Sequence, residues 1–304
     1  MRFSFGFPLM AHPQNPDFLA APAIAELARA AEAAGFDSCS FTEHPLPNDA
    51  WLTSGGHDAL DPFVALAVAA TATTRLRLLT NLTPVPYRNP AILAKTVATL
   101  DRLSGGRVIL GAGVGYLESE FEAVGVDFAQ RNALFDECLE VMRMIWTGES
   151  VNYRGSNFSI AQSTALPTPV QSPVPVWIGG NSKLSRRRVA ESAQGWMPMP
   201  NPRSLASRRR SAPLETLDEL ALMIAYMRDH AEAVGRTEPI DIQYMDIQVG
   251  AVGSPAWNPQ LHLENIAALS KLGVTSIAAY LTGDTRSQVA EAIGQYGEEV
   301  IASL

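Results

Sequence analysis

The feature that most constrains the fold is a regular alternation of short apolar runs with longer helical patterns along the 304 residues. Runs rich in β-branched and aliphatic residues predict buried strands, and apolar residues spaced three or four apart predict amphipathic helices. Such alternation is typical of parallel strands joined by crossover helices. The predicted strands lie near residues 2–7, 37–42, 76–82, 107–112, 174–178, 195–198, 240–249 and 274–281. The predicted helices lie near residues 22–34, 58–73, 90–104, 131–147, 183–193, 214–234, 260–271 and 285–301.

Eight strands in strict alternation with eight helices favour a closed barrel over an open sheet, because closure gives each strand a partner on both edges. We therefore predict a single α/β domain over residues 1–304, a (β/α)8 TIM barrel. Insertions are expected after the fourth and sixth strands, the latter a polar and mobile segment over 199–213. A small hairpin is expected before the fifth strand, within residues 148–173.

The composition excludes several classes of protein. Hydrophobic residues make up 47% and charged residues 18% of the chain, as in folded globular proteins. A net charge of −8 argues against nucleic-acid binding, which depends on a basic surface. No signal peptide and no apolar run near the ~18 residues of a membrane span is found, so no membrane association and a cytoplasmic location are expected. Cys39 and Cys138 are expected to be reduced and buried.

Three glycines at alternate positions, Gly111, Gly113 and Gly115, end the predicted fourth strand. Backbone without side chains at a strand end allows a flat ring or a phosphate to come close. A dinucleotide-binding turn would need glycines at the first, third and sixth positions of a strand-to-helix turn, whereas the sixth position here is Tyr116. The pattern therefore favours another architecture that ends its strands in glycine.

In a barrel the active site lies at the carboxyl ends of the strands, so the residues that follow each strand are the candidates. Glu43 and His44 follow the second strand, and Tyr116 follows the fourth. A histidine followed by proline at this end favours hydrogen bonding or proton transfer over a packing role. No metal site is expected, because the chain has no His-x-x-x-His or Cys-x-x-Cys spacing. Hydrolase and kinase functions lack their usual Gly-x-Ser-x-Gly and Gly-Lys-Ser motifs.

The segment from Gly179 to Ser182 leads from the fifth strand straight into a helix. One interpretation is a phosphate site, because a helix N-terminus presents unpaired N–H groups and a partial positive charge. The other is a tight turn in which Ser182 is an ordinary N-cap. The sequence leaves both interpretations open.

Large side chains near the strand ends suit a flat apolar ring that carries a phosphate. They are Trp51, Tyr87, Tyr116, Trp177, Trp196 and Met197. Trp177 lies within its strand and is expected in the core, whereas Tyr116 and Trp196 at strand ends are candidates for contact with a ring or substrate.

Taken together, these residues resemble the bacterial luciferase-like monooxygenase superfamily, in the branch that uses the deazaflavin coenzyme F420. The resemblance spans nearly the whole chain and depends on motifs in a fixed order. They are Glu43-His44, Arg88 to Pro90, Leu103 to Gly115, Pro167 to Pro173, Trp177 to Gly180, and Gly195 to Pro198. Many relatives have an aspartate where this chain has Glu43, and a tryptophan or glutamate where it has Tyr116.

The resemblance implies a barrel whose mouth holds a deazaflavin or flavin, with His44 beside the ring. Glu43 and Tyr116 are the other candidate catalytic residues, and a non-prolyl cis peptide is implied at Asn81-Leu82, behind the ring. The candidate cofactor-binding residues are Thr80, Asn81, Leu82, Gly111, Gly113, Gly115, Gly179, Gly180, Asn181 and Trp196.

The predicted function is that of an oxidoreductase that uses coenzyme F420 and transfers hydride between deazaflavin C5 and a small organic substrate. An FMN-dependent monooxygenase of the luciferase-like kind is the first alternative, and a non-catalytic protein that binds a flavin or deazaflavin is the second. The resemblance also implies a homodimer.

Overall fold

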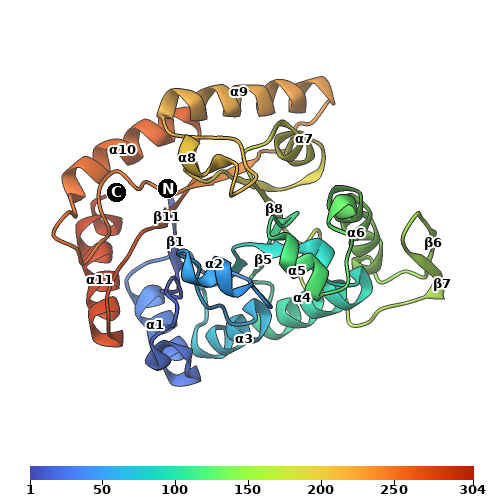
Figure 1. Ribbon diagram of the computed structural model, residues 1–304, viewed down its shortest axis with the longest axis horizontal. Coiled ribbons are helices and arrows are strands. Elements are labelled where there is room, and N and C mark those ends of the chain that lie inside the picture. Colours follow the sequence, from blue (N-terminus) through green and yellow to red (C-terminus); the bar gives the residue numbers. More distant parts are fainter.

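The computed structural model describes residues 1–304, and its parallel strands close into a barrel surrounded by helices (Figure 1). The strands are ordered β3-β2-β1-β11-β10-β9-β8-β5, and a further pairing of β3 with β5 closes the ring. Their bounds are β1 Arg2–Gly6, β2 Ser38–Phe41, β3 Arg77–Thr80, β5 Val108–Gly113, β8 Val176–Gly179, β9 Gly195–Met197, β10 Asp241–Tyr244 and β11 Ser276–Ala279. The predicted TIM barrel is confirmed.

Eight helices cover the outside of the barrel. They are α1 Ala21–Ala33, α3 Pro62–Ala72, α4 Pro90–Ser104, α6 Arg131–Trp146, α7 Lys183–Ser192, α9 Leu217–Ala233, α10 Pro259–Leu272 and α11 Arg286–Glu299. The helix predicted from residue 58 begins later because Asp61 is its N-cap and accepts from the N–H groups of Phe63 and Val64. No helix is long and apolar enough to span a membrane.

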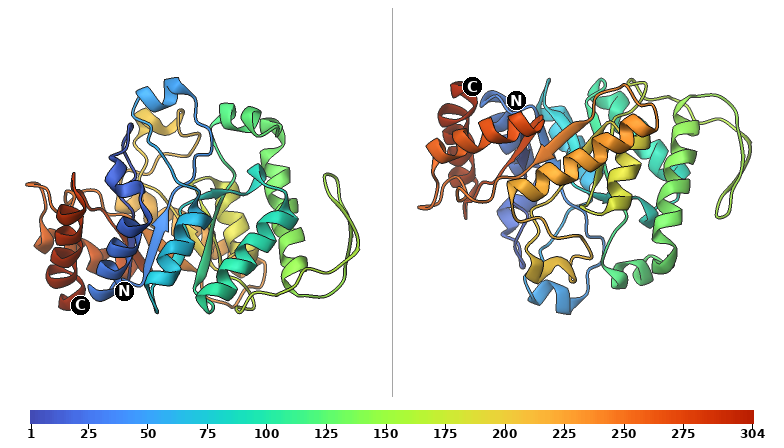
Figure 2. Two further views of the ribbon diagram at one scale, coloured as in Figure 1. Left: turned by 90° about the horizontal axis from the view of Figure 1, so that it is seen from below. Right: turned by 90° about the horizontal axis from the view of Figure 1, so that it is seen from above.

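Short elements decorate the connections. They are the helices α2 Asp49–Thr53, α5 Glu118–Ala123 and α8 Arg203–Ala206, the strand β4 Thr83–Pro84, and the 3-10 turns η1 Pro16–Leu19, η2 Val85–Tyr87, η3 Phe128–Gln130 and η4 Ile301–Ser303. An antiparallel hairpin of β6 Val151–Arg154 and β7 Ser159–Ser163 stands away from the barrel (Figure 2), within the segment where the sequence predicts one. The predicted strand over 240–249 is shorter, because it ends at Tyr244.

The direction of each side chain follows from strand alternation, since successive residues point to opposite faces. Leu79, Ile109, Trp177 and Met197 form a small cluster of their own, as expected for side chains that fill the barrel interior. Their strand neighbours Leu78, Leu110, Ile178 and Trp196 belong to the large core between strands and helices. Both cysteines are free and buried, as predicted.

Barrel closure depends on Gly111. A Cβ on this residue would lie 1.8 Å from the carbonyl oxygen of Thr80 on the neighbouring strand. The Thr80 hydroxyl is fully buried and donates to the Gly111 carbonyl at 2.8 Å, which fixes the two strands together. No side chain larger than hydrogen fits here without a shift of backbone.

We expect Gly111→Ala to lower the free energy of unfolding by about 2–4 kcal/mol, because the added methyl forces β3 and β5 apart. Gly294→Ala is the matched control, since its Cβ would meet no atom within 4 Å and lies in helix α11. That change should be neutral or stabilise by up to about 1 kcal/mol. Urea unfolding of both variants measures the difference, and equal stabilities would contradict this role for Gly111.

Candidate active site

The carboxyl ends of the strands, here called the mouth, bring His44 together with a group of aromatic rings. The ring of His44 lies 4.4 Å from that of Trp51, 5.1 Å from that of His57 and 6.0 Å from that of Tyr116, measured between centroids. Trp51 reaches this position because Asn48 is the N-cap of α2 and accepts from the Trp51 N–H. Burial lowers the pKa of His57, which favours its neutral form.

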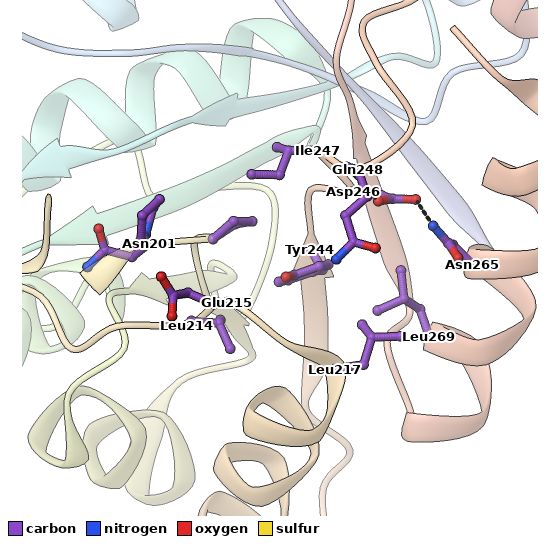
Figure 3. A pocket seen from close by; sticks show the side chains of 12 residues that line it. Asn201, Leu214, Glu215, Leu217, Tyr244, Asp246, Ile247, Gln248, Asn265 and Leu269 are labelled. Carbon is purple, nitrogen blue, oxygen red and sulfur yellow. Dashed lines mark hydrogen bonds between the residues drawn. The ribbon is translucent and has the colours of Figure 1, made fainter. Parts of the chain in front are cut away.

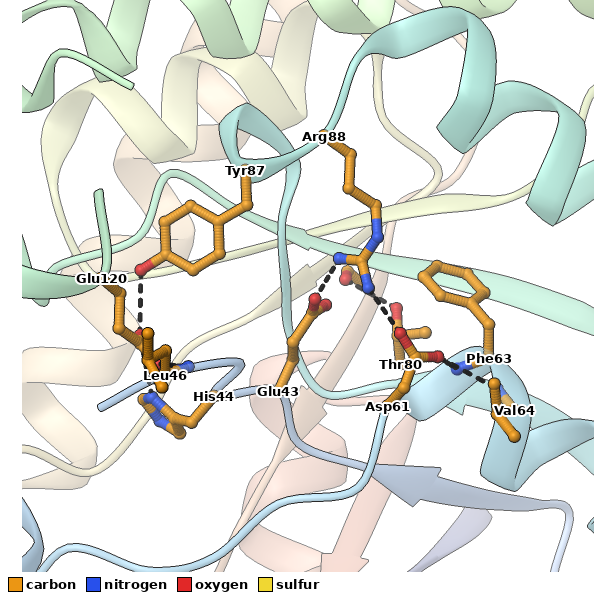
Figure 4. A network of polar contacts seen from close by, with 11 residues as sticks. Glu43, His44, Leu46, Asp61, Phe63, Val64, Thr80, Tyr87, Arg88 and Glu120 are labelled. Atoms are coloured by element: carbon orange, nitrogen blue, oxygen red, sulfur yellow. Dashed lines mark hydrogen bonds and ion pairs between the residues drawn. The ribbon is translucent and has the colours of Figure 1, made fainter. Parts of the chain in front are cut away.

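A buried carboxylate holds His44 in place (Figure 4). Glu120 on α5 is fully buried, and its Oε2 lies 3.1 Å from Nδ1 of His44. The same carboxylate accepts from the Tyr87 hydroxyl at 3.0 Å and from the N–H of Leu46 at 3.3 Å. Burial, and next the nearby Glu120, raise the pKa of Tyr87, so the phenol stays a donor.

The hydrogen-bond partner of Nδ1 decides which ring nitrogen of neutral His44 carries the proton. A carboxylate oxygen accepts a hydrogen bond, so the network assigns the proton of the neutral ring to Nδ1. Nε2 then carries the lone pair. The side chain of His44 is only 8% exposed, which keeps bulk water from competing for that position. This arrangement can accept a proton at Nε2 and return it.

Glu43 does not take part in this cluster, and its catalytic role stays a prediction. It is adjacent to His44 in an extended segment, so its side chain points to the other face and forms an ion pair with Arg88. Arg88 also binds Asp61 at 2.7 Å (Figure 4). Burial raises the pKa of Glu43, and the opposing effect of Arg88 is the smaller one. Glu43 therefore belongs to the wall that supports the site.

Three predicted cofactor-binding side chains also turn away from the mouth. Thr80 and Trp196 are fully buried on the outer face of their strands, where Thr80 bonds Gly111 and the Trp196 indole donates to the Gly180 carbonyl at 2.9 Å. Alternation places Met197 rather than Trp196 inside the barrel, and the cofactor-binding role of Thr80 and Trp196 stays a prediction. Gly111 is likewise committed to barrel closure.

Asn181 is the third of these side chains, and its hydrogen bonds go to the insertion over residues 199–213. Its Nδ2 donates to the carbonyls of Met199 and Ala212, and its Oδ1 accepts from the Met199 N–H. Asn201, fully buried, pairs with Leu214 in an antiparallel bridge at the base of the same insertion. The mobile segment predicted over 199–213 is therefore anchored at its base.

Leu82 forms an apolar floor at the mouth. A Cβ on Gly179 would lie 2.1 Å from Leu82 Cδ1, and one on Gly113 would lie 3.4 Å from it, so the two glycines make room for this side chain. Leu82 packs on the interior cluster that contains Trp177 and Met197. The Asn81-Leu82 peptide bond is cis, as the resemblance implied.

The turn from Gly179 to Ser182 has the N-cap that the sequence suggested. Ser182 accepts from the Ser185 N–H at 3.0 Å, and the N–H groups of Gly180 and Asn181 donate to Met197 and Ser211. The N–H groups of Lys183 and Leu184, at the start of α7, have no acceptor within the helix. Both interpretations of this turn are therefore compatible with its geometry.

A cavity of about 150 Å³ lies beside the mouth, at the ends of β9 and β10 (Figure 3). Tyr244, Asp246 and Asn201 line it, together with Glu215 and Gln248. Asp246 is fixed there, because it bonds buried His262 at 3.0 Å and Asn265 at 2.9 Å. No group of three or more His, Cys, Asp or Glu residues is arranged to hold a metal ion.

Sequence reasoning missed Glu120 and His57. The run Glu118-Ser119-Glu120 has the appearance of a solvated acidic surface, and only the fold shows that one of its carboxylates is buried. His57 belongs to no motif in the sequence, and only the fold brings its ring to 5.1 Å from that of His44. The spacing of four residues between Tyr116 and Glu120 is the one local sequence pattern that relates Glu120 to a predicted site residue.

Comparison with known proteins decides the family. A sequence model of luciferase-like monooxygenases matches residues 3–260. The chain belongs to the luciferase-like monooxygenase family.

Relatives of this luciferase-like protein include two of wide coverage. An uncharacterized protein of Mycobacterium tuberculosis is 32% identical over 233 residues, which are 73% of this chain and 75% of that protein. The F420-dependent glucose-6-phosphate dehydrogenase of Amycolatopsis mediterranei is 29% identical over 231 residues, 70% of this chain and 68% of the relative. The crystal structure of the monooxygenase RslO1 from Streptomyces bottropensis shares the fold, with a TM-score of 0.81 at 22% identity over 100% of this chain and 99% of that one.

We expect Glu120→Gln to release His44. An amide offers one acceptor oxygen in place of two and turns an N–H toward a donor, so the free energy of unfolding should fall by about 1–3 kcal/mol. In ¹⁵N spectra His44 should change from the Nδ1–H tautomer to a mixture. Glu122→Gln, exposed on the same helix, is the control. An unchanged His44 spectrum in Glu120→Gln would contradict the assigned tautomer.

Proposed function

We propose that this protein is an F420-dependent oxidoreductase that acts on a small organic substrate at the mouth of the barrel. The family supports an oxidoreductase, and the relative from Amycolatopsis named as F420-dependent supports the deazaflavin. When bound, coenzyme F420 supplies hydride chemistry at deazaflavin C5. The protein's own residues then have to bind the ring, orient the substrate and move one proton.

The residues at the mouth fit a flat apolar ring. Leu82, backed by Trp177 and Met197, offers an apolar surface, and the strand ends beside it are the glycines Gly113 and Gly179. Gly6 ends β1 as an exposed residue whose Cβ would meet nothing nearer than Ser40 Oγ at 3.8 Å. The first turn of α7 is the candidate for the cofactor phosphate, because a helix N-terminus attracts anions.

The His44–Glu120 pair is the observation that carries the proposal. Nδ1 is held at 3.1 Å by a buried carboxylate, so Nε2 is the atom that exchanges a proton with the substrate. Tyr116 lies beside it and is a second proton donor, and burial raises its pKa so that the phenol remains protonated. We assign His44 and Tyr116 as catalytic residues and Glu120 as the positioning residue.

An FMN-dependent monooxygenase is the second candidate, supported by the family's own description and by the fold shared with a monooxygenase. The identity of the cofactor distinguishes the two candidate functions, because a deazaflavin has carbon in place of flavin N5 and reacts poorly with oxygen. Fluorescence titration of the purified protein with F420 and with FMN tests this directly. Binding of F420 at least about tenfold tighter than FMN supports the proposal, and the reverse order supports the monooxygenase. The homodimer and the cytoplasmic location stay predictions.

We expect His44→Asn to lower kcat by at least about a hundredfold, because general acid–base help of this kind is worth about 10² to 10⁴ in rate. The dissociation constant of the cofactor should change only a few-fold, since the ring's contacts remain. His230→Asn is the control, because His230 binds Glu191 on the outer helices. Turnover within threefold of wild type in His44→Asn would assign the proton to Tyr116 or water.

A further inference from the structure

Residues 199–213, here called the roof, cross the mouth of the barrel. In the closed ring of strands, β2 and β9 lie opposite one another, four positions apart in either direction. The roof follows β9, yet Arg208 donates to the hydroxyl and carbonyl oxygens of Ser54, at the end of α2 and after β2, at 2.7 and 3.0 Å. Helices α2 and α8 lie at the same end of the barrel (Figure 2). Any molecule at the mouth lies beneath this crossing.

The roof contains four arginines, and two of them lack an acidic partner. Arg208 and Arg209 form no ion pair, and the contacts of Arg209 are the carbonyl of Pro200 at 3.4 Å and the amide oxygen of Asn201 at 3.5 Å. The other two are paired, because Arg210 binds Glu118 at 2.8 Å and Arg203 binds Glu215 and Glu219. The protein as a whole carries a net charge of −8, so an unpaired basic cluster at this place is a local reversal of charge.

The other charges that face the cluster do not neutralise it. The guanidinium of Arg131 lies 3.9 Å and that of Arg210 4.4 Å from the ring centre of Phe128, where they are held by cation–π contact. Glu120 is buried, and its carboxylate already accepts hydrogen bonds from three donors. Burial raises the pKa of Tyr116, and the positive charges of Arg209 and Arg208 oppose this.

The arrangement leaves two cations that lack a counter-charge on the segment that contacts the end of α2. Ser54 follows the helix that carries Trp51, and Glu118 begins the helix that carries Glu120. The roof therefore touches both of the elements that position His44. A guanidinium binds carboxylate and phosphate oxygens with directed, charge-assisted hydrogen bonds.

We propose that Arg208 and Arg209 bind an anionic group, a carboxylate or a phosphate, of the molecule that occupies the mouth. This rests on the proposed function, because it names a chemical class for the ligand of the same site. The anion belongs either to the substrate or to the carboxylates of the glutamyl tail of coenzyme F420, beyond the phosphate that the first turn of α7 would hold. The experiment distinguishes these sources.

The test compares wild type with Arg208→Gln/Arg209→Gln and with Arg208→Lys/Arg209→Lys, which keeps both charges. Arg154→Gln is the matched control, because this exposed arginine lies on the hairpin away from the mouth and forms no ion pair. Ser54→Ala weakens the contact across the mouth while leaving both guanidiniums in place. The probes are F420, its tail-free deazaflavin precursor and inorganic phosphate, with chloride used to hold ionic strength constant.

A tail-binding role predicts that the double glutamine variant binds F420 at least about tenfold more weakly and the tail-free deazaflavin as wild type does. A substrate-binding role predicts unchanged F420 binding but at least about tenfold weaker binding of inorganic phosphate to the F420-loaded protein, measured by calorimetry. In both cases the lysine variant retains most of the binding, and Arg154→Gln and Ser54→Ala behave as wild type.

Unchanged affinity of the double glutamine variant for all three probes would overturn the proposal. Failure of the proposed function has a different signature, because wild-type protein would then bind neither F420 nor the tail-free deazaflavin. Phosphate binding by the unloaded protein would still test the two arginines in that case. If the double glutamine variant does not fold, the single variants Arg208→Gln and Arg209→Gln provide the same comparison.

Discussion

The contact between the Thr80 carbonyl and Gly111 is the constraint on which the rest of the structure depends. It allows β3 to pair with β5 and so turns a row of parallel strands into a ring. Only in a ring do the loops after β2, β5, β8 and β9 face a common centre. His44, Tyr116, the Gly179 turn and the roof are brought together by that closure.

Closure also explains why neighbouring residues at the strand ends have different roles. On each strand, one residue faces the mouth while its neighbour is fixed in the surrounding wall. His44 reaches the mouth and Glu43 binds Arg88 behind it. Met197 lies inside the barrel and Trp196 holds the Gly180 carbonyl from outside. Asn181 connects the turn from Gly179 to Ser182 with the roof, so the two segments share one anchor.

The sequence predicted the fold well because its periodicity is a local property that survives in every strand and helix. It predicted His44 and Tyr116 for the same reason, since both follow strands directly. It failed where the answer depends on the direction of a side chain or on a distant contact. Thr80 and Trp196 are each one residue away from the side chains that point into the barrel, Leu79 and Met197. Glu120 lies in an acidic run of the sequence, and only tertiary packing shows that it is buried. The role of Asn181 depends on an insertion that no local pattern could place.

The central claim is that a deazaflavin ring lies on Leu82 with Nε2 of His44 directed toward its reactive face. A crystal structure of the protein with coenzyme F420 bound measures this most directly. The expected result is a ring at the mouth, in contact with Leu82, and a His44 that keeps its Nδ1 contact to Glu120 while Nε2 faces the ring or the substrate space beside it. A ring bound in the cavity beside β10, or a His44 whose Nε2 points away from the ring, would contradict the claim.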